Sequence, residues 1–395
     1  MTLHLASLIV SALGTFLALA GIGYFLAALA AALLHHGQRT PAAPEFAPGV
    51  SILKSLKGLD PAMLEAFRTH CRQSYQGEYE ILFGVADADD PAVEAVAQLQ
   101  AEFPAHAIRL LVCPERLGTN GKISTLAQME HAAHYGYLLI NDSDITVTST
   151  YLTSVMRCFA PVAGKPPVGL VTALYRGRAH GSLWSSFEAL GISTDFQAGV
   201  MLSKRIEGGL HYGLGSTLAV DRAALEKAGG LMGLVDQLAD DYEMGARIDK
   251  TGYRVALATE VVETSVPDYA WSGFRDHQLR WLRTVRDARP GGYLGMIFTH
   301  GFAWACVNLF ASGFSTLAMA IFLASFVVRL AMALVVGRVV LGDRQLPAML
   351  PLVPVRDLFQ LGLWLAGFSG NTIVWRGQRF VLHKGKLIGT GNTAQ

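Results

Sequence analysis

Long apolar runs lie near both ends of the chain, and a region of shorter alternating runs lies between them. No Lys, Arg, Asp or Glu occurs from Leu3 to Leu34, and this run exceeds the roughly 20 apolar residues that a membrane-spanning helix requires. A cleaved signal peptide would instead have a basic amino-terminal region and an apolar core of about 7–15 residues. Since the run has neither feature, the pattern predicts a transmembrane anchor at residues 1–36.

A second apolar stretch covers residues 294–336 and is interrupted by Gly313 and, late, by Arg329. It extends over more than 40 residues, which is long enough for a helical hairpin of two spans. Such a hairpin would return the chain to the side of the membrane from which it entered.

A last apolar stretch falls within residues 346–370. Its apolar part, Asp357–Phe368, is too short to span comfortably, so we expect a re-entrant or interfacial segment. The alternative is a full fourth crossing, which would place the basic tail at residues 371–395 on the side that the positive-inside rule disfavours. The basic residues of this tail are Arg376, Arg379, Lys384 and Lys386.

The charges that flank the first apolar run predict its orientation. His35, His36 and Arg39 follow the run, whereas nothing basic apart from His4 stands at its start. The positive-inside rule therefore places the following domain in the cytosol. We expect a linker rich in Pro and Ala at residues 37–48 and a cytosolic domain at residues 49–290.

Within that domain, short β-rich runs alternate with helical stretches. Helices are expected from about Pro61, Pro91 and Lys122, and this alternation predicts an α/β fold with a mostly parallel sheet and helices on both faces. Ligands in such sheets bind at the carboxyl ends of the strands. The runs that we predict to be strands are Val50–Leu53, Glu80–Val85, Ile108–Val112 and Tyr137–Ile140.

Composition supports a membrane protein and excludes some other classes. The chain is 51% hydrophobic and only 16% charged, which is apolar for a soluble protein. A net charge of +1 gives no indication of a nucleic-acid partner. The cysteines have no metal-ligand spacing, and we expect reduced core thiols at Cys71, Cys113, Cys158 and Cys306.

Two carboxylates directly follow the last predicted strand, in Asp142-Ser143-Asp144. Such a pair can hold Mg²⁺ or Mn²⁺, which would neutralise the charge that develops on a departing diphosphate. The alternative is a solvated turn at the end of a strand, which Asp and Ser also favour.

An acidic cluster also follows the strand at Glu80–Val85. Asp87 or Asp89 could accept a hydrogen bond from the base or ribose of a nucleotide. Asp90 precedes Pro91, and this order is typical of a helix cap.

A third acidic motif is Asp240-Asp241-Tyr242, in a stretch of helical character. A carboxylate that accepts a proton from an attacking hydroxyl is what an inverting displacement of a sugar requires. Two acids on the exposed face of a helix are the alternative interpretation.

The last candidate motif is Asp276–Arg283, within an interfacial helix expected near residues 271–288. Arg280 could form two hydrogen bonds to diphosphate oxygens, and Trp281 could stack on an apolar face of sugar or lipid. Alternatively, this amphipathic helix uses Arg and Trp as anchors at the membrane surface.

In this order the motifs resemble the processive-type family of GT-A glycosyltransferases, in which three acidic motifs precede a (Q/R)-x-x-R-W motif. The similarity is closest to the ceramide glucosyltransferase family and extends from the first apolar run to the tail. It implies a Rossmann-like GT-A catalytic domain with transmembrane helices at both ends. Further matching stretches are Ser51–Gly58, Gly118–Lys122, Gly215–Thr217 and Ala239–Tyr242.

The resemblance implies a role for each motif. Asp87 or Asp89 would contact uridine, Asp142 and Asp144 would contact the ribose and the metal, and Asp241 would be the catalytic base. Arg280 and Trp281 would close the site around the diphosphate and the acceptor. The donor is further expected to contact Lys54 and Lys122, and the acceptor His277 and Asp240.

Two departures bear on the substrates. His277 stands where the family usually has Gln or Arg, and the D-x-D motif is complete, whereas animal ceramide enzymes commonly lack its second acid. Both features are similar to a bacterial branch associated with hopanoid biosynthesis. The expected donor is therefore UDP-N-acetylglucosamine or UDP-glucose, and the expected acceptor is bacteriohopanetetrol or ceramide at a bacterial inner membrane.

Two rival functions are considered. A processive polysaccharide synthase shares the acidic motifs and the R-W motif, but it needs enough helices to form a polymer channel, and about three spans are too few. A non-catalytic nucleotide-sugar sensor or membrane scaffold is the other rival, and the presence of all the motifs argues against it.

Overall fold

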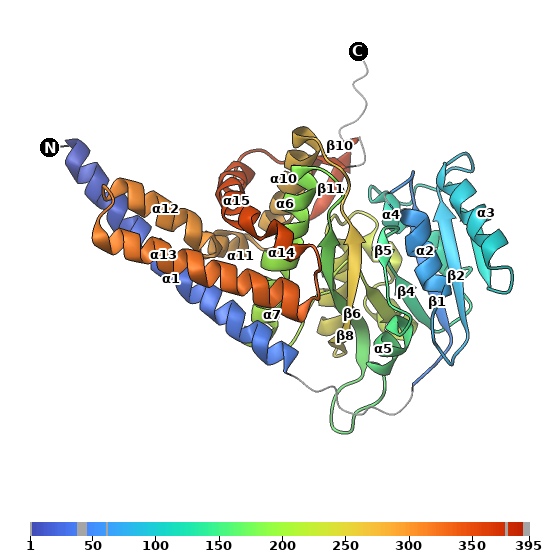
Figure 1. Ribbon diagram of the computed structural model, residues 1–395. Helices are drawn as coiled ribbons and strands as arrows, with labels where there is room; N and C mark the ends of the chain where they lie inside the picture. The colour runs from blue at the N-terminus through green and yellow to red at the C-terminus, as the bar shows by residue number, and fades with distance from the viewer. Residues whose placement is uncertain (1, 38–45, 61, 376–377, 390–395) are drawn as a thin grey trace, which may run out of the picture.

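The computed structural model describes residues 2–37, 46–60, 62–375 and 378–389 (Figure 1). Its centre is an eight-stranded mixed sheet in the order β3-β2-β1-β4-β7-β6-β8-β5, and this arrangement confirms the predicted α/β class. The strands are β1 (Val50–Leu56), β2 (Tyr79–Val85), β3 (Ile108–Val112), β4 (Tyr137–Ile140), β5 (Ile145–Thr146), β6 (Val168–Arg178), β7 (Leu218–Asp221) and β8 (Arg254–Ser265).

The first four strands are parallel and coincide with the four predicted runs, although β1 continues to Leu56. Their side chains alternate between two buried layers, so that Ile52 joins one hydrophobic cluster and Leu53 the other. The connecting helices are α2 (Met63–Cys71), α3 (Ala92–Glu102) and α4 (Gly121–Glu130). Pro61, where a helix start was predicted, lies outside the described residues.

The second half of the sheet is mixed, since β7 runs antiparallel to β4 and β6, whereas β6 and β8 are parallel to each other. The helical elements of this half are α5 (Tyr151–Arg157), α6 (Leu183–Gly191), the π-helical turn η1 (Ile192–Phe196), α7 (Gln197–Ile206), α8 (Arg222–Lys227), η2 (Leu231–Leu234), α9 (Asp240–Lys250) and α10 (Trp271–Ala288).

Four helical segments in the described residues are long and apolar enough to cross a membrane: Leu5–His36, Pro290–Ala311, Thr316–Val340 and Leu346–Gly367. They contain α1 (Thr2–His36), α11 (Pro290–Gly295), η3 (Met296–His300), α12 (Gly301–Ala311), α13 (Thr316–Ala333), η4 (Leu334–Val340), α14 (Leu346–Met349), η5 (Leu350–Leu352) and α15 (Val353–Gly367).

Helices α1, α12 and α13 form a slanted bundle that extends away from the sheet (Figure 1). A Cβ built on Gly21 of α1 would lie 2.1 Å from Cα of Gly301 in α12, so the two backbones approach closely. Small residues allow this kind of contact between membrane helices. The side chains of Phe25 and Ala28 also join the hydrophobic cluster on one side of the sheet, which packs the bundle against the α/β domain.

The segment around α15 differs from a simple crossing because both of its ends contact the catalytic domain. Before α14, Gln345 exchanges two hydrogen bonds with the backbone of Ala179. At the other end, Arg286 of α10 donates to the carbonyl oxygen of Gly367 at 2.6 Å. The whole helical segment Leu346–Gly367 is nonetheless long enough to span a membrane, so the re-entrant interpretation stays a prediction.

The carboxyl-terminal tail forms a small sheet of β9 (Thr372–Trp375), β10 (Gln378–His383) and β11 (Lys386–Gly389). Backbone hydrogen bonds join it to the catalytic domain, from Leu387 N to Asp236 O and from Leu238 N to Gly385 O, each 3.0 Å long. Most of the predicted linker and tail residue Arg376 lie outside the described residues.

Candidate functional site

Acidic and basic side chains meet beyond the carboxyl end of β4. Lys122, in the first turn of α4, donates to Asp142 Oδ1 at 2.5 Å and lies 3.9 Å from Asp240 Oδ2. Burial alone would lower the pKa of Lys122, but the charges of Asp142 and Asp240 outweigh it and raise this pKa. The structure therefore brings together side chains from two motifs nearly 100 residues apart.

Lys54 reaches the same place from β1. Its side chain is fully buried, and its Nζ donates to the carbonyl oxygen of Asp142 at 3.1 Å. Burial lowers the pKa of Lys54 to about 7, although Asp144 and Asp142 counteract this shift. A second lysine side chain thus contacts the Asp142-Ser143-Asp144 turn.

Asp144 accepts a hydrogen bond from Thr264 of β8, and Ser143 donates to Asp60. Burial raises the pKa of Asp144 to about 6, and the neighbouring charge of Asp142 adds to the shift. A carboxylate that is both desolvated and close to another carboxylate is a group that a bound cation would stabilise.

Buried amides hold the two loops of the site in place. Asn141 donates to the carbonyl oxygen of Ser216 at 2.6 Å, and its Oδ1 lies 3.2 Å from Nε2 of His70. Asn120 caps α4 through its contact with Ile123 N and also donates to Asp240 Oδ1 at 3.3 Å. These bonds explain why the Gly118–Lys122 turn and the Asp240-Asp241 motif lie together.

The two adjacent acids at the start of α9 differ in environment. Asp240 is 7% exposed and points toward Asn120 and Lys122, whereas Asp241 is half-buried. Burial raises the pKa of Asp241, although its bond from Tyr242 N counteracts the shift. Burial also raises the pKa of Asp240, to about 6, so basicity does not separate the two acids. The greater exposure of Asp241 makes it the more accessible proton acceptor of the two.

Gly215 lies close against Asp241. A Cβ at this position would lie 3.0 Å from Asp241 Oδ2 and 3.8 Å from Asp142 Oδ2. The absence of a side chain at Gly215 therefore lets both carboxylates approach the same stretch of backbone.

The first acidic cluster lies apart from these contacts. Asp87 and Asp89 are exposed, and no hydrogen bond joins either of them to the Asp142 turn. Asp90 accepts from Ala92 N at 2.9 Å and from Gly58 N at 3.0 Å. Asp90 therefore caps α3 and is hydrogen-bonded to the loop that follows β1. A nucleotide contact of Asp87 or Asp89 stays a prediction.

Helix α10 forms the other wall of the site. His277 shares a 2.8 Å contact with Glu188 of α6, and its ring lies 5.1 Å from that of Trp281. Arg280 is half-buried. Burial raises the pKa of nearby Tyr269, and Glu188 adds to this shift while Arg280 opposes it.

Three residues of this wall were not identified from the sequence: Tyr175, Glu188 and Phe196. Burial raises the pKa of Tyr175, and the charges of Asp241, Asp142 and Glu188 add to it, so Tyr175 lies near all three acids. Its ring is 5.7 Å from Phe196, which is 6.3 Å from Trp281. None of the three belongs to a sequence motif. Only Glu188, as the one acid in a helix without other charged residues, could have been noticed from the sequence.

The residues present fit a divalent cation if substrate supplies part of its coordination. Among the described residues, no group of three or more His, Cys, Asp or Glu side chains forms a ready metal cage. Mg²⁺ and Mn²⁺ sites commonly combine one or two carboxylates with phosphate oxygens. Asp142 and the desolvated Asp144 provide that donor set.

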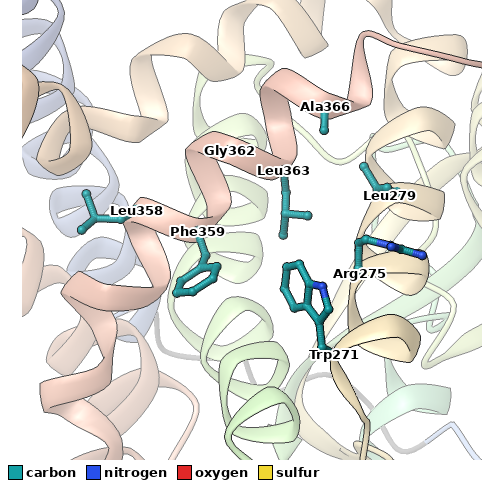
Figure 2. A pocket seen from close by; sticks show the side chains of 8 residues that line it. All are labelled: Trp271, Arg275, Leu279, Leu358, Phe359, Gly362, Leu363 and Ala366. Carbon is teal, nitrogen blue, oxygen red and sulfur yellow. The ribbon is translucent and has the colours of Figure 1, made fainter.

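An apolar groove of about 480 Å³ lies between α10 and α15. Figure 2 shows Trp271, Phe359 and Leu363 pointing into the space between these helices. The groove residues of α10, Trp271, Arg275 and Leu279, follow at four-residue spacing and so line a different face of the helix from His277 and Trp281. The groove is therefore separate from the acidic site.

Comparisons with known proteins agree with this arrangement. The model of glycosyl transferase family 21 matches residues 13–388. Ceramide glucosyltransferase 3 of Caenorhabditis elegans is 26% identical over 60% of this chain and 50% of its own length. Ceramide glucosyltransferase of Komagataella phaffii is 30% identical over 29% of this chain and 23% of its own. The chain thus spans about half the length, or less, of these curated relatives.

Among solved structures, the mannosyltransferase PcManGT from Pyrobaculum calidifontis, determined with GDP-Man and Mn²⁺, superposes with a TM-score of 0.54. It is 18% identical, and the match covers 91% of this chain and 97% of that one. This similarity supports the fold.

Proposed function

Because the chain belongs to glycosyl transferase family 21, we propose that it transfers a sugar from a UDP-sugar to a hydroxyl group of a membrane lipid, with inversion at the anomeric carbon. One observation carries the proposal: four carboxylates and two lysines lie together beyond the carboxyl end of β4, and helix α10 beside them packs on α15. The four carboxylates are those of Asp142, Asp144, Asp240 and Asp241.

On the donor side, Lys122 and Arg280 would bind diphosphate oxygens, and Lys54 would add positive charge from below. A divalent cation held by Asp142 and Asp144 would neutralise the charge of the departing UDP. In the free protein Lys122 pairs with Asp142, so we expect it to turn toward the diphosphate when the donor binds. Asp87 or Asp89 would contact the uridine at the exposed edge of the sheet.

On the acceptor side, Asp241 would take the proton from the lipid hydroxyl as the oxygen attacks the anomeric carbon. Gly215 has no side chain that would crowd Asp241 and Asp142, both of which lie beside it. His277 and Trp281 would hold the acceptor on the α10 side. Asp240, buried against Asn120 and Lys122, would orient Lys122, and its contact with the acceptor stays a prediction.

The lipid acceptor is supported by the membrane-spanning character of four helices and by the ceramide glucosyltransferases among the relatives. We propose that the catalytic domain faces the cytosol of a bacterial cell. For the finer substrates, we propose UDP-N-acetylglucosamine or UDP-glucose as donor and bacteriohopanetetrol or ceramide as acceptor.

Incubation of the purified protein with each of the two donors and each of the two lipids tests the proposal. Mass spectrometry should show a lipid heavier by one hexose or one N-acetylhexosamine, and the coupling constant of the anomeric proton should identify a β-glycoside. A long polysaccharide product would favour a processive synthase instead. Binding of UDP without transfer to any lipid would favour a sensor or scaffold.

A further inference from the structure

A cluster of charged side chains joins the membrane helices to the wall of the site. Arg329 of α13 donates to Asp195 Oδ1 at 2.7 Å and to Asp357 Oδ2 at 2.8 Å, and Arg356 also pairs with Asp195. The side chains of Arg329, Arg356 and Asp357 are 2%, 6% and 9% exposed. Two arginines balance two aspartates, so the cluster is neutral as a whole.

Such a cluster is poorly explained by stability alone. Buried ion pairs commonly contribute no more to stability than apolar side chains of the same size would. Ionisable side chains in membrane helices are expensive and commonly serve function. The position that Arg329 and Arg356 impose on Asp195 therefore calls for a functional explanation.

Asp195 belongs to η1, a π-helical turn between α6 and α7. Single π-helical turns within helices occur frequently at functional sites. The next residue is Phe196, whose ring contacts Tyr175 and Trp281. Phe196 is 39% exposed, so part of this ring stays available beside the aromatic side chains that border the acids.

We propose that Phe196 is an acceptor-binding residue and that Asp195, held by Arg329 and Arg356, is a positioning residue that fixes it in the site. The proposal rests on the proposed lipid acceptor. The ring would pack on the apolar part of the lipid next to its hydroxyl group. Helices α13 and α15 thus form part of the active site through their arginines.

The first test replaces Phe196 in the full-length protein. Complete burial of such a side chain is worth about 10- to 150-fold in an equilibrium constant, and 39% of this one remains to be covered. Phe196→Ala should therefore raise the acceptor KM about 3- to 7-fold and leave the Kd for UDP within twofold of wild type. Phe196→Tyr should restore the acceptor KM.

The matched control is Phe310→Ala. Phe310 is 71% exposed on α12, at the end of the bundle away from the sheet, and its removal should leave the acceptor KM unchanged. An acceptor KM for Phe196→Ala that equals that of this control would overturn the acceptor role.

The second test examines whether Asp195 acts through Phe196. Asp195→Asn with Arg356→Gln removes one charge of each sign, so no charge is left buried and unpaired. This double variant should raise the acceptor KM about as much as Phe196→Ala, whereas Arg68→Gln with Glu102→Gln, which removes an exposed ion pair on α2 and α3, should not.

Combining the Asp195 double variant with Phe196→Ala should produce no further increase, since residues that act as one unit are not additive. Additive effects on the acceptor KM would refute the positioning role of Asp195.

The outcomes also separate the two proposals: if the wild-type protein glycosylates neither ceramide nor bacteriohopanetetrol, the proposed function fails. If it glycosylates one and Phe196→Ala has no effect, only this inference fails.

Discussion

Replacement of Asp241 by Asn tests the assignment of the catalytic base most directly. The substitution keeps the shape of the side chain and the oxygen that accepts from Tyr242 N at 2.8 Å, but it removes the ability to take a proton. Since the side chain is half-buried and keeps the bond from Tyr242 N while losing the one from the backbone of Gly215, we expect the free energy of unfolding to fall by about 1 kcal/mol.

The expected loss of rate follows from the function of the group. General base catalysis contributes roughly 10²–10⁴-fold, which corresponds to about 2.7–5.4 kcal/mol of transition-state stabilisation. The loss should appear in kcat, because Asp241 receives the proton only as the acceptor oxygen attacks. Binding of UDP should be nearly unchanged.

Asp240→Asn is the matched control, since it makes the same chemical change one residue away. Adjacent residues of α9 point about 100° apart, and Asp240 is directed toward Asn120 and Lys122. Its loss should cost about 1–3 kcal/mol of stability and reduce kcat less than Asp241→Asn does.

The assay is single-turnover transfer to the lipid, followed by mass spectrometry, together with calorimetric titration of UDP. A variant Asp241→Asn that transfers sugar near the wild-type rate, combined with an inactive but folded Asp240→Asn, would refute the assignment. It would mean that Asp241, the more exposed of the two adjacent acids, is not the proton acceptor.

Three further predictions concern the metal, the topology and the thiols. Excess EDTA should abolish transfer and added Mn²⁺ or Mg²⁺ should restore it, and Asp144→Ala should lower kcat far more than Thr146→Ala; full activity in EDTA would contradict the metal site. Lys386 is exposed in a small sheet that is hydrogen-bonded to Asp236 and Leu238. A cysteine introduced at this position should react with a membrane-impermeant maleimide in inverted vesicles but not in intact cells. Labelling in intact cells would refute the prediction that the tail and the α/β domain lie on the same side of the membrane. Because burial raises the pKa of Cys71 to about 11, its alkylation should be slow at pH 8 and should accelerate up to about pH 11 as the thiolate fraction rises; rapid labelling of the native protein at pH 8 would contradict the buried environment.

Local pattern in the sequence was sufficient for the α/β class and for the first four strands. Alternating and continuous apolar runs reflect burial on one or both faces of a strand, and this information is local. The long charge-free run at the amino terminus is equally local, because a helix satisfies its own backbone hydrogen bonds in lipid. The order of acidic motifs also sufficed for the family, which the match over residues 13–388 confirms.

Other features depended on contacts between distant residues. The sequence offered no way to rank Asp240 against Asp241 except by motif, whereas packing buries one against Asn120 and leaves the other half-exposed. Arg329 appeared only as an interruption of an apolar run, and its partner Asp195 stands 134 residues away.

The sequence by itself therefore determined the first four strands, the long apolar helix at the amino terminus and the set of chemical groups. Only the tertiary structure decided which of these groups meet, how far each is desolvated, and that Tyr175, Glu188 and Phe196 complete the wall of the site. The physical reason is that the pKa of a carboxylate and the exposure of a ring depend on neighbours that the sheet and the helix bundle bring together. These neighbours are distant in the sequence, so the local sequence pattern does not identify them.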